Sequence, residues 1–501
     1  MGPKNGRNDR NMKKIIAIVK KEVYNYPTSP PFLSDYDYPE LEKVFVSNIV
    51  NNVFSMVRES FVLMGYDKEN YGTDRWNPLG QLIRPGDKVL IKPNMVMHQN
   101  HNTDGGNECL YTHPSVVAAV LIYVLKALKT SGSIIVGDAP MQECDFNMLI
   151  NESGYLEMIN FFKDNAPVGI KIEIIDFRDL YSEVKLGVHK QHINKNTNGV
   201  VVDLGSESEF HGLSMDEFER LRITNYDPDE LKKHHNMDTN EYMINSHILD
   251  ADVIINVPKP KTHRKAGVTI ALKNLVGINA RKEYLPHHMN GAKEDGGDEY
   301  LYRSRKKLLI NRLYDIRNRC VGHGKYARAF ISKVFIKLVR IFGHNDSLDN
   351  YYEGNWYGND TISKTIVDLN KIVMFADHLG KMTTTRQRKY FIVADMIISG
   401  EKEGPVAPSP KNVGIIAAGE NPVCFDEVIA TLMGADINKI PSLRLSRKSN
   451  SIYQFVNIDD VPYIVSNIET LNGKEIRNIC EEDILNYVPT SGWRKVFRTR
   501  Y

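Results

Sequence analysis

The chain has 501 residues, of which 42% are hydrophobic and 25% charged, as in ordinary soluble globular proteins. Its formal net charge is +2, so no global positive field marks it as a nucleic-acid-binding protein. Its five cysteines lack short spacings, which argues against a disulfide framework, a zinc ribbon or an iron–sulfur cluster. These features indicate a cytoplasmic protein without a nucleic-acid partner.

The N-terminal part predicts one strand and one helix. After a polar lead, residues 15–19 predict a strand, and this apolar run is too short for a signal-peptide core or a membrane span. An amphipathic helix is expected within residues 41–64. We therefore expect this part to extend a larger folded core.

A strand–helix–strand unit begins that core. Strands are expected at 88–91 and 133–136, around a helix at 114–129 that Thr112 or Ser115 is suited to cap.

A further run of elements leads to the most informative segment. A helix at 146–163 and a strand at 170–175 precede a polar, loop-rich stretch that runs to about residue 240. Residues 252–257 then predict an apolar strand that ends in prolines, lysines, a threonine and a histidine. A helical pattern follows within 267–277.

The next segment is unusually basic. Between residues 302 and 340, twelve Lys and Arg residues stand against the single acid Asp315. Apolar residues recur at helical spacing from 327 to 342, which predicts a basic amphipathic helix. Such a helix is most often a lid or a packing element. Peripheral membrane contact through 303–342 is the alternative.

The core then resumes. A helix at 363–379, strands beginning at 391 and 413, and a helix at 422–433 are expected. Strands alternating with helices predict an α/β fold with a mostly parallel open sheet, flanking helices and a basic helical insertion. The predicted division is an N-terminal extension at 1–85, core at 86–279, the insertion at 280–355, core at 356–436 and a C-terminal extension at 437–501.

Polar side chains follow four of the expected strands at the point where each strand ends. Open parallel sheets bind ligands outside the carboxyl ends of their strands, so these groups should meet at one rim if the strands are neighbours. Lysines and amides there suit an anionic substrate. The predicted substrate-binding residues are Lys92, Asn94, Asp138, Lys259, Thr262, Lys273 and Asn274.

Four residues near the same strand ends are the catalytic candidates: His263, Lys261, Glu401 and Glu403. A histidine beside lysines should be held neutral and suit proton transfer, and carboxylates can act as general bases. Each residue also has a structural alternative, namely solvated lysines, a loop histidine and a charged loop. Asp138 could likewise cap a helix.

A divalent metal is a further hypothesis. His287, His288 and Asp395 are the candidate ligands, although adjacent histidines point different ways in most backbones. We expect no iron–sulfur cluster.

Several motifs resemble the domain-of-unknown-function 362 family over about residues 86–435. They are Val89-Leu-Ile-Lys-Pro-Asn94, Thr112-His-Pro114, Gly137-Asp-Ala-Pro140, Pro258-Lys-Pro-Lys-Thr-His263, Leu272-Lys-Asn-Leu-Val-Gly277, Glu403-Gly-Pro405, Asn421-Pro-Val-Cys-Phe-Asp426 and Leu432-Met-Gly434. The resemblance implies a family whose chemistry is unsettled. Some relatives carry a ferredoxin-like iron–sulfur domain, and this chain lacks its closely spaced cysteines.

The leading hypothesis is an enzyme of open reaction type that acts on a phosphorylated or carboxylated small molecule. Metal assistance and a place in surface polysaccharide biosynthesis are parts of that hypothesis. The chain has no P-loop, dinucleotide-binding, nucleophile-elbow or zincin motif. The alternative is a non-catalytic protein that binds a partner or an anionic polymer, and an electron-transfer protein is the third candidate.

Overall fold

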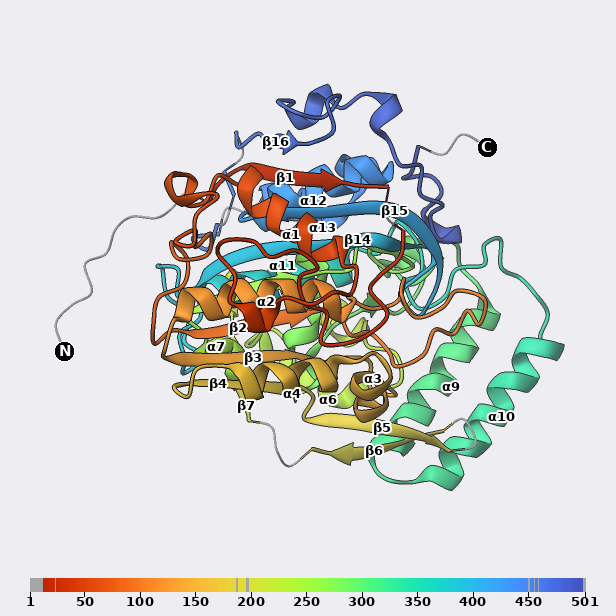
Figure 1. The fold of residues 1–501 in the computed structure, drawn as a ribbon. Helices are drawn as coiled ribbons and strands as arrows, with labels where there is room; N and C mark the ends of the chain where they lie inside the picture. Colours follow the sequence, from red (N-terminus) through yellow and green to blue (C-terminus); the bar gives the residue numbers. More distant parts are fainter. Residues whose placement is uncertain are drawn as a thin grey trace.

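The computed structural model describes residues 12–22, 24–185, 188–194, 198–448, 451–454, 456–457 and 459–498. Most of the polar lead therefore lies outside the described residues. The centre of the molecule is one large sheet in the order β16-β1-β15-β14-β10-β2-β3-β4 (Figure 1). These strands are β1 Ile15–Lys20, β2 Lys88–Pro93, β3 Gly132–Asp138, β4 Ile170–Asp176, β10 Val253–Val257, β14 Lys389–Glu403, β15 Ala407–Gly419 and β16 Tyr463–Ser466.

The sheet is mostly parallel. β15 runs antiparallel to both β14 and β1, and the other neighbouring pairs in this order are parallel. The predicted fold class is thereby confirmed. β1 and β16 come from the two predicted terminal extensions, so both extensions add strands to the central sheet.

Helices cover both faces of the sheet, which explains the near-continuous apolar strands. Val89 and Ile91 belong to one buried core, and Leu90 between them belongs to the other. One face is covered by α1 Asn52–Leu63, α2 Pro114–Leu128, α3 Phe146–Glu152 and α4 Tyr155–Asn165. The opposite face carries α7 Ser246–Asp250, α8 Ala271–Asn274, α11 Thr361–Phe375, α12 Pro422–Met433 and α13 Pro441–Lys448.

Two local predictions were wrong on the face of the sheet that α2, α3 and α4 cover. The cap of α2 is His113, whose Nδ1 accepts from the Ser115 amide at 3.2 Å. Thr112 instead donates its hydroxyl to the Val257 carbonyl at 2.7 Å and so joins two strand ends. The single helix expected at 146–163 is divided into α3 and α4 at Gly154, whose φ of 85° is left-handed.

The stretch expected to be loop-rich up to residue 240 also contains regular structure. Two of its strands, Leu180–Lys185 and Val188–Ile193, are rich in polar residues, so they lack the apolar pattern that reveals a strand in sequence. The elements are β5 Leu180–Lys185, β6 Val188–Ile193, β7 Gly199–Asp203, α5 Met215–Arg220, β8 Leu221–Arg222 and α6 Pro228–His234, and β9 Glu241–Asn245 follows them.

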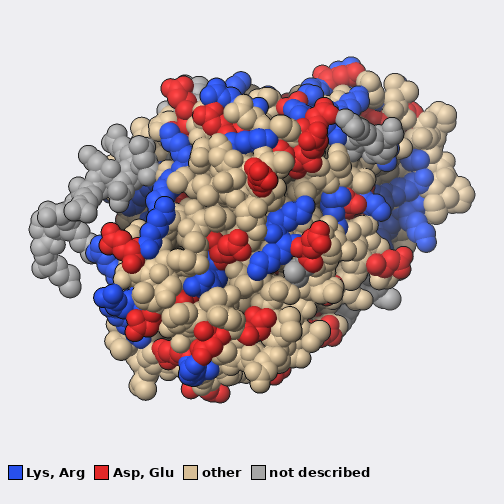
Figure 2. All heavy atoms as spheres, turned by 45° about the horizontal axis from the view of Figure 1, so that its top comes forward, with Lys and Arg blue, Asp and Glu red and all other residues tan. Residues whose placement is uncertain are grey.

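The basic segment forms a helical hairpin. α9 Arg305–Gly322 and α10 Tyr326–Phe342 lie side by side at the edge of the molecule, away from the sheet (Figure 1). Gly324, with a φ of 68°, lies in the turn between them. Figure 2 shows positive and negative side chains interspersed over the face viewed, in keeping with a formal net charge of +2. In the described part of the chain, no helix is long and apolar enough to cross a membrane.

Candidate active site

The four strands with polar ends are neighbours in the sheet. β14, β10, β2 and β3 follow one another in that order and run parallel, so β10, β2 and β3 end at one edge, whereas β14 continues past it. Two further short strands, β11 Lys261–His263 and β12 Gly267–Thr269, form a hairpin just beyond β10, and β11 pairs with β14. Three of the four strand ends expected at the rim therefore meet there, and the end of β14 lies beyond it.

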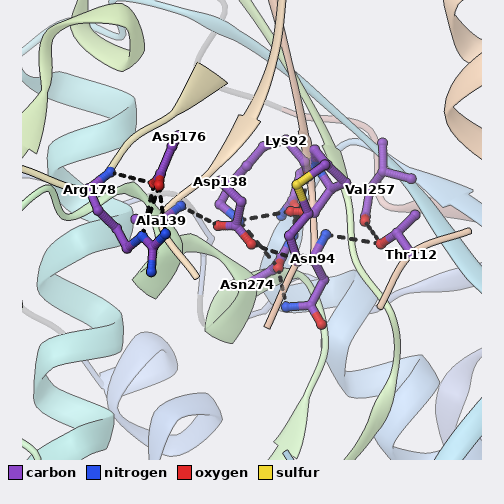
Figure 3. A network of polar contacts seen from close by, with 12 residues as sticks. Lys92, Asn94, Thr112, Asp138, Ala139, Asp176, Arg178, Val257 and Asn274 are labelled. Atoms are coloured by element: carbon purple, nitrogen blue, oxygen red, sulfur yellow. Dashed lines mark hydrogen bonds and ion pairs between the residues drawn. The ribbon is translucent and has the colours of Figure 1, made fainter. Parts of the chain in front are cut away.

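A buried ion pair joins the ends of β2 and β3. Lys92 Nζ lies 2.7 Å from Asp138 Oδ1, and both side chains are almost entirely buried. The same carboxylate accepts from the Met95 amide at 2.6 Å and from the Ala139 amide at 2.9 Å (Figure 3). Asp138 thus ties two strand ends together instead of capping a helix. Gly277 is required beside it, because a Cβ there would lie 1.9 Å from Asp138 Oδ1.

An amide chain extends this network across the rim. Asn94 Nδ2 donates to Asn274 Oδ1 at 2.8 Å, and Lys261 Nζ donates to Asn94 Oδ1 at 2.7 Å (Figure 3 shows Asn94 and Asn274). Asn274 Nδ2 in turn donates to Asn256 Oδ1 at 2.7 Å. Burial lowers the pKa of Lys261 to about 7. The network therefore fixes the direction of each amide at the floor of the site.

A cavity of about 340 Å³ opens above this floor. Six of the predicted residues line it: Asn94, Asp138, His263, Lys273, Asn274 and His287. Four further residues along its wall have buried polar atoms without a hydrogen-bond partner within the described ranges. These atoms are Gln142 Oε1, Glu143 Oε2, Tyr226 OH and Thr269 Oγ1. Such orphaned groups are costly unless water or a ligand satisfies them.

Three lysines of the cavity wall are poorly compensated. Lys265 donates to Thr224 Oγ1 at 3.0 Å and Lys282 to the Ala139 carbonyl at 2.8 Å, so each is bonded to a neutral acceptor. Lys273 has no hydrogen-bond partner among the residues that the structure describes.

Burial lowers the pKa values of these lysines. It brings the pKa to about 8 for Lys265 and Lys273 and to about 7 for Lys282, and neighbouring cations add to each shift. The cavity therefore presents ammonium groups that lack a counter-charge.

The two histidines of the cavity have defined proton positions. His263 Nδ1 accepts from the backbone amides of Lys265 and Ala266, at 3.0 and 3.1 Å, so its proton sits on Nε2. His287 Nδ1 lies 2.7 Å from the Leu285 carbonyl oxygen and must donate to it, which leaves Nε2 as an acceptor. Burial, reinforced by nearby cations, holds both pKa values well below the usual range. One neutral proton donor and one neutral proton acceptor thus belong to the same cavity.

Lys259 lies in a separate buried cluster. Its Nζ is 3.0 Å from Asp395 Oδ2 and 2.6 Å from the Tyr26 hydroxyl, which donates to Asp395 Oδ1 at 2.6 Å. Tyr26 also stacks on His113 at 4.0 Å. This cluster does not line the cavity, and it attaches the N-terminal segment to β14.

Two predicted catalytic acids also lie apart from the cavity. Glu401 accepts from the Val488 amide at 2.9 Å, and Glu403 accepts from the Ser491 amide at 3.1 Å. Thr262 donates to the Lys402 carbonyl at 2.8 Å. The hairpin of β14 and β15 thus carries these groups outward to the C-terminal segment, while its tip at 405–406 touches the cavity.

The three candidate metal ligands do not share a site. His287 lines the main cavity, His288 lines a smaller pocket, and Asp395 is bonded to Lys259. The two histidines diverge because neighbouring side chains on extended backbone point to opposite sides. Over the residues described, no group of three or more His, Cys, Asp or Glu side chains is arranged to hold a metal ion.

Sequence reasoning missed several cavity residues. Lys265 lies four positions after Lys261 in the same cationic block, so the density of charge there was a usable signal. Lys282 and Tyr226 carry no local signal, because tertiary contacts bring them to the cavity. For Lys282, the Gly277 carbonyl accepts from the Ala139 amide at 2.8 Å, which holds the chain before Lys282 against the end of β3.

Comparison with known proteins supports the family resemblance. The family model described as "Domain of unknown function (DUF362)" matches residues 89–194 and 182–431. The thylakoid-associated protein sll1697 of Synechocystis sp. is 26% identical over 216 residues, which are 43% of this chain and 46% of that protein. The alignment thus spans less than half of that relative. Because the family matches cover more than half of the sequence, the chain belongs to the DUF362 family.

Proposed function

We propose that this chain is an enzyme whose cavity binds a phosphorylated or carboxylated small molecule and exchanges a proton with it. The observation that carries the proposal is Lys273, a half-buried lysine that lines the cavity without a hydrogen-bond partner in the described structure. An anion would supply the missing counter-charge, because charge-assisted hydrogen bonds are strongest where water is excluded.

The balance of charge supports an anionic ligand. Arg264, Lys265, Lys273 and Lys282 line the cavity against two acids, and one of these acids, Asp138, is already paired with Lys92. The cavity volume of about 340 Å³ falls within the range of roughly 300–1,000 Å³ that small-molecule sites occupy.

The histidines support proton transfer. His287 Nε2 is a neutral acceptor and His263 Nε2–H is a neutral donor, so the pair can remove a proton from one position of a ligand and supply one at another. Ammonium groups around a bound carboxylate or phosphate would stabilise negative charge that develops as the proton leaves. The reaction class we propose is therefore proton abstraction beside an anionic group.

A thermal-shift screen with inorganic phosphate, citrate and UDP tests the binding step. The wild type should gain stability with at least one of them, in proportion to ligand occupancy, and Lys273→Gln should lose that gain. Lys171→Gln, at an exposed position on β4, is the matched control and should respond like the wild type. The same gain in all three proteins would place the anion elsewhere.

Deuterium exchange distinguishes the proposed enzymatic function from that of a non-catalytic binding protein. In D2O, proton NMR should show exchange of a carbon-bound hydrogen of a bound carboxylate in the wild type. His287→Gln should bind the same compound without exchange. Binding with no exchange in any tested compound would favour the alternative function, an anion-binding protein without catalysis.

We also propose a cytoplasmic, membrane-peripheral location. The free cysteines fit a reducing compartment. The relative from Synechocystis sp. is described as thylakoid-associated, which supports a membrane-peripheral place for this chain as well.

A further inference from the structure

The outer helix of the hairpin has an apolar face that nothing in the described structure covers. α10 packs on α9 through Ala329, Ser332 and Ile336, which are buried, and Ser332 donates to the Leu313 carbonyl at 2.8 Å. The opposite side carries seven large apolar side chains, each between 42% and 79% exposed. They are Phe330, Ile331, Val334, Phe335, Leu338, Ile341 and Phe342.

The spacing of these residues places them on one stripe. They recur at intervals of one, three and four positions, which is the repeat of a single helix face. Soluble monomers rarely expose a continuous apolar patch above a few hundred Å², roughly the area that this stripe would cover. The stripe therefore indicates a surface that is buried in a working assembly.

The charges beside the stripe identify the kind of partner. α10 contains Arg328, Lys333, Lys337 and Arg340 and no acidic residue. Arg328 and Lys337 are exposed, and the helical repeat puts Lys333, Lys337 and Arg340 along one border of the stripe and Arg328 on the other. A second copy of this chain docked through α10 would bring like charges together. An apolar face bordered by cations instead matches a bilayer surface with anionic headgroups.

The dimensions of α10 fit a helix that lies in the plane of a membrane. Its 17 residues span about 25 Å, and it does not qualify as a membrane-crossing helix in the described chain. We infer that α10 docks the protein on the anionic surface of a lipid bilayer. The apolar stripe enters the boundary between headgroups and acyl chains, and the basic border contacts lipid phosphates.

The docking helix is linked to the cavity wall through α9. Arg222 and Asp315 form a bidentate ion pair at 3.0 Å, and Arg317 donates to Asn225 Oδ1 at 2.5 Å. Asn225 and its neighbour Thr224 line the cavity. α9 therefore connects the docking helix to residues of the cavity wall. The inference itself rests on α10 and does not depend on what the cavity binds.

Vesicle flotation tests the inference with the full-length chain. We expect the wild type to float with vesicles of phosphatidylcholine mixed with phosphatidylglycerol, and far less with phosphatidylcholine alone. The variant Ile331→Asp/Phe335→Asp should lose at least about tenfold in vesicle binding, because two charges would have to enter the acyl boundary. Arg328→Gln/Lys337→Gln should bind anionic vesicles more weakly than the wild type, and its residual binding should depend less on salt because fewer charges contribute.

A control variant and a folding check distinguish loss of membrane docking from loss of structure. Met215→Asp changes another exposed apolar side chain, 71% accessible on α5, and should float like the wild type. Both altered α10 residues are exposed, so circular dichroism should show folded variants. The inference is overturned if the wild type does not float with anionic vesicles, or if Ile331→Asp/Phe335→Asp floats equally well. A wild-type dimer that this variant dissociates, with no vesicle binding by either protein, would assign the stripe to a second copy.

Discussion

Lys261 Nζ donates a hydrogen bond to Asn94 Oδ1 at 2.7 Å, and the two residues are 167 positions apart in the sequence. Lys261 also donates to the Leu110 carbonyl, so its ammonium group is held by two oxygen acceptors. Lys273, in the same cavity region, has none among the described residues. The buried Lys261 is therefore held by the fold, whereas the half-buried Lys273 lines the cavity and is available to a ligand.

This contrast gives the first prediction, for stability without ligand. Lys261→Met should destabilise the fold by about 1–3 kcal/mol, because two buried acceptors lose their donor. Lys273→Met should leave the free energy of unfolding unchanged or raise it by about 1 kcal/mol, since it removes a half-buried charge that has no partner among the described residues. Urea unfolding of both variants makes the comparison. Equal losses would mean that Lys273 has a structural partner.

The second prediction concerns the ion pair at the ends of β2 and β3. Asp138→Asn should cost about 3–5 kcal/mol of stability, because it leaves the Lys92 ammonium buried without a carboxylate. The double variant Lys92→Met/Asp138→Asn should recover part of the loss, and chemical denaturation measures both. If the single variant is as stable as the wild type, the pair is not buried as described.

Gly277 supplies the third prediction. A methyl group there would lie 1.9 Å from Asp138 Oδ1 and 2.9 Å from Lys92 Nζ. Gly277→Ala should therefore lower stability by about 1–3 kcal/mol or more through overpacking. In the Asp138→Ala background, where the carboxylate is absent, the same substitution should cost less. A similar cost in both backgrounds would contradict the proposed clash.

The fourth prediction is a pH dependence of anion binding. Burial lowers the pKa of Lys265 and Lys273 to about 8 and of Lys282 to about 7, so these groups lose protons as the pH rises through that range. A bound dianion favours their protonated forms, so binding takes up protons and affinity falls with rising pH. Sulfate keeps its charge in this range, and its affinity should drop at least about tenfold from pH 7 to pH 9.5. Lys273→Gln should show a shallower profile, whereas a flat profile in the wild type would count against the lysine cluster.

The fifth prediction separates the outer glutamates from the cavity. Glu401→Gln and Glu403→Gln each retain an oxygen that can accept from the Val488 or Ser491 amide. Stability should change by less than about 1 kcal/mol, and sulfate affinity at pH 7 should stay within about twofold of the wild type. A large loss of sulfate affinity in either variant would show that the substituted acid contributes to the anion site.

The sequence supported prediction of the sheet and of part of the rim for a definite physical reason. Parallel strands buried on both faces are continuous apolar runs, and each must end in a turn. The polar residues after β2, β3 and β10, such as Asn94, Asp138 and His263, were therefore recognisable, and the parallel order of these strands brings them together.

The other site residues could not be placed from the sequence, because their positions depend on tertiary contacts that local sequence patterns do not encode. Lys282 and Tyr226 reach the cavity through the fold of segments far from the strand ends. Glu401 and Glu403 follow the same kind of strand as the other candidates, but β14 continues into a long hairpin with β15 that carries them outward. The length of that hairpin, set by pairing with β15, could not be inferred from the apolar run alone.

The most direct test of the cavity as an anion site is isothermal titration calorimetry of pyrophosphate into the wild-type chain at pH 7, with Lys273→Gln and Lys171→Gln measured alongside. We expect saturable binding at one site per chain, at least about tenfold weaker in Lys273→Gln and unchanged in Lys171→Gln. Absence of saturable binding by the wild type, or equal affinity in all three proteins, would contradict the assignment of the cavity as an anion site.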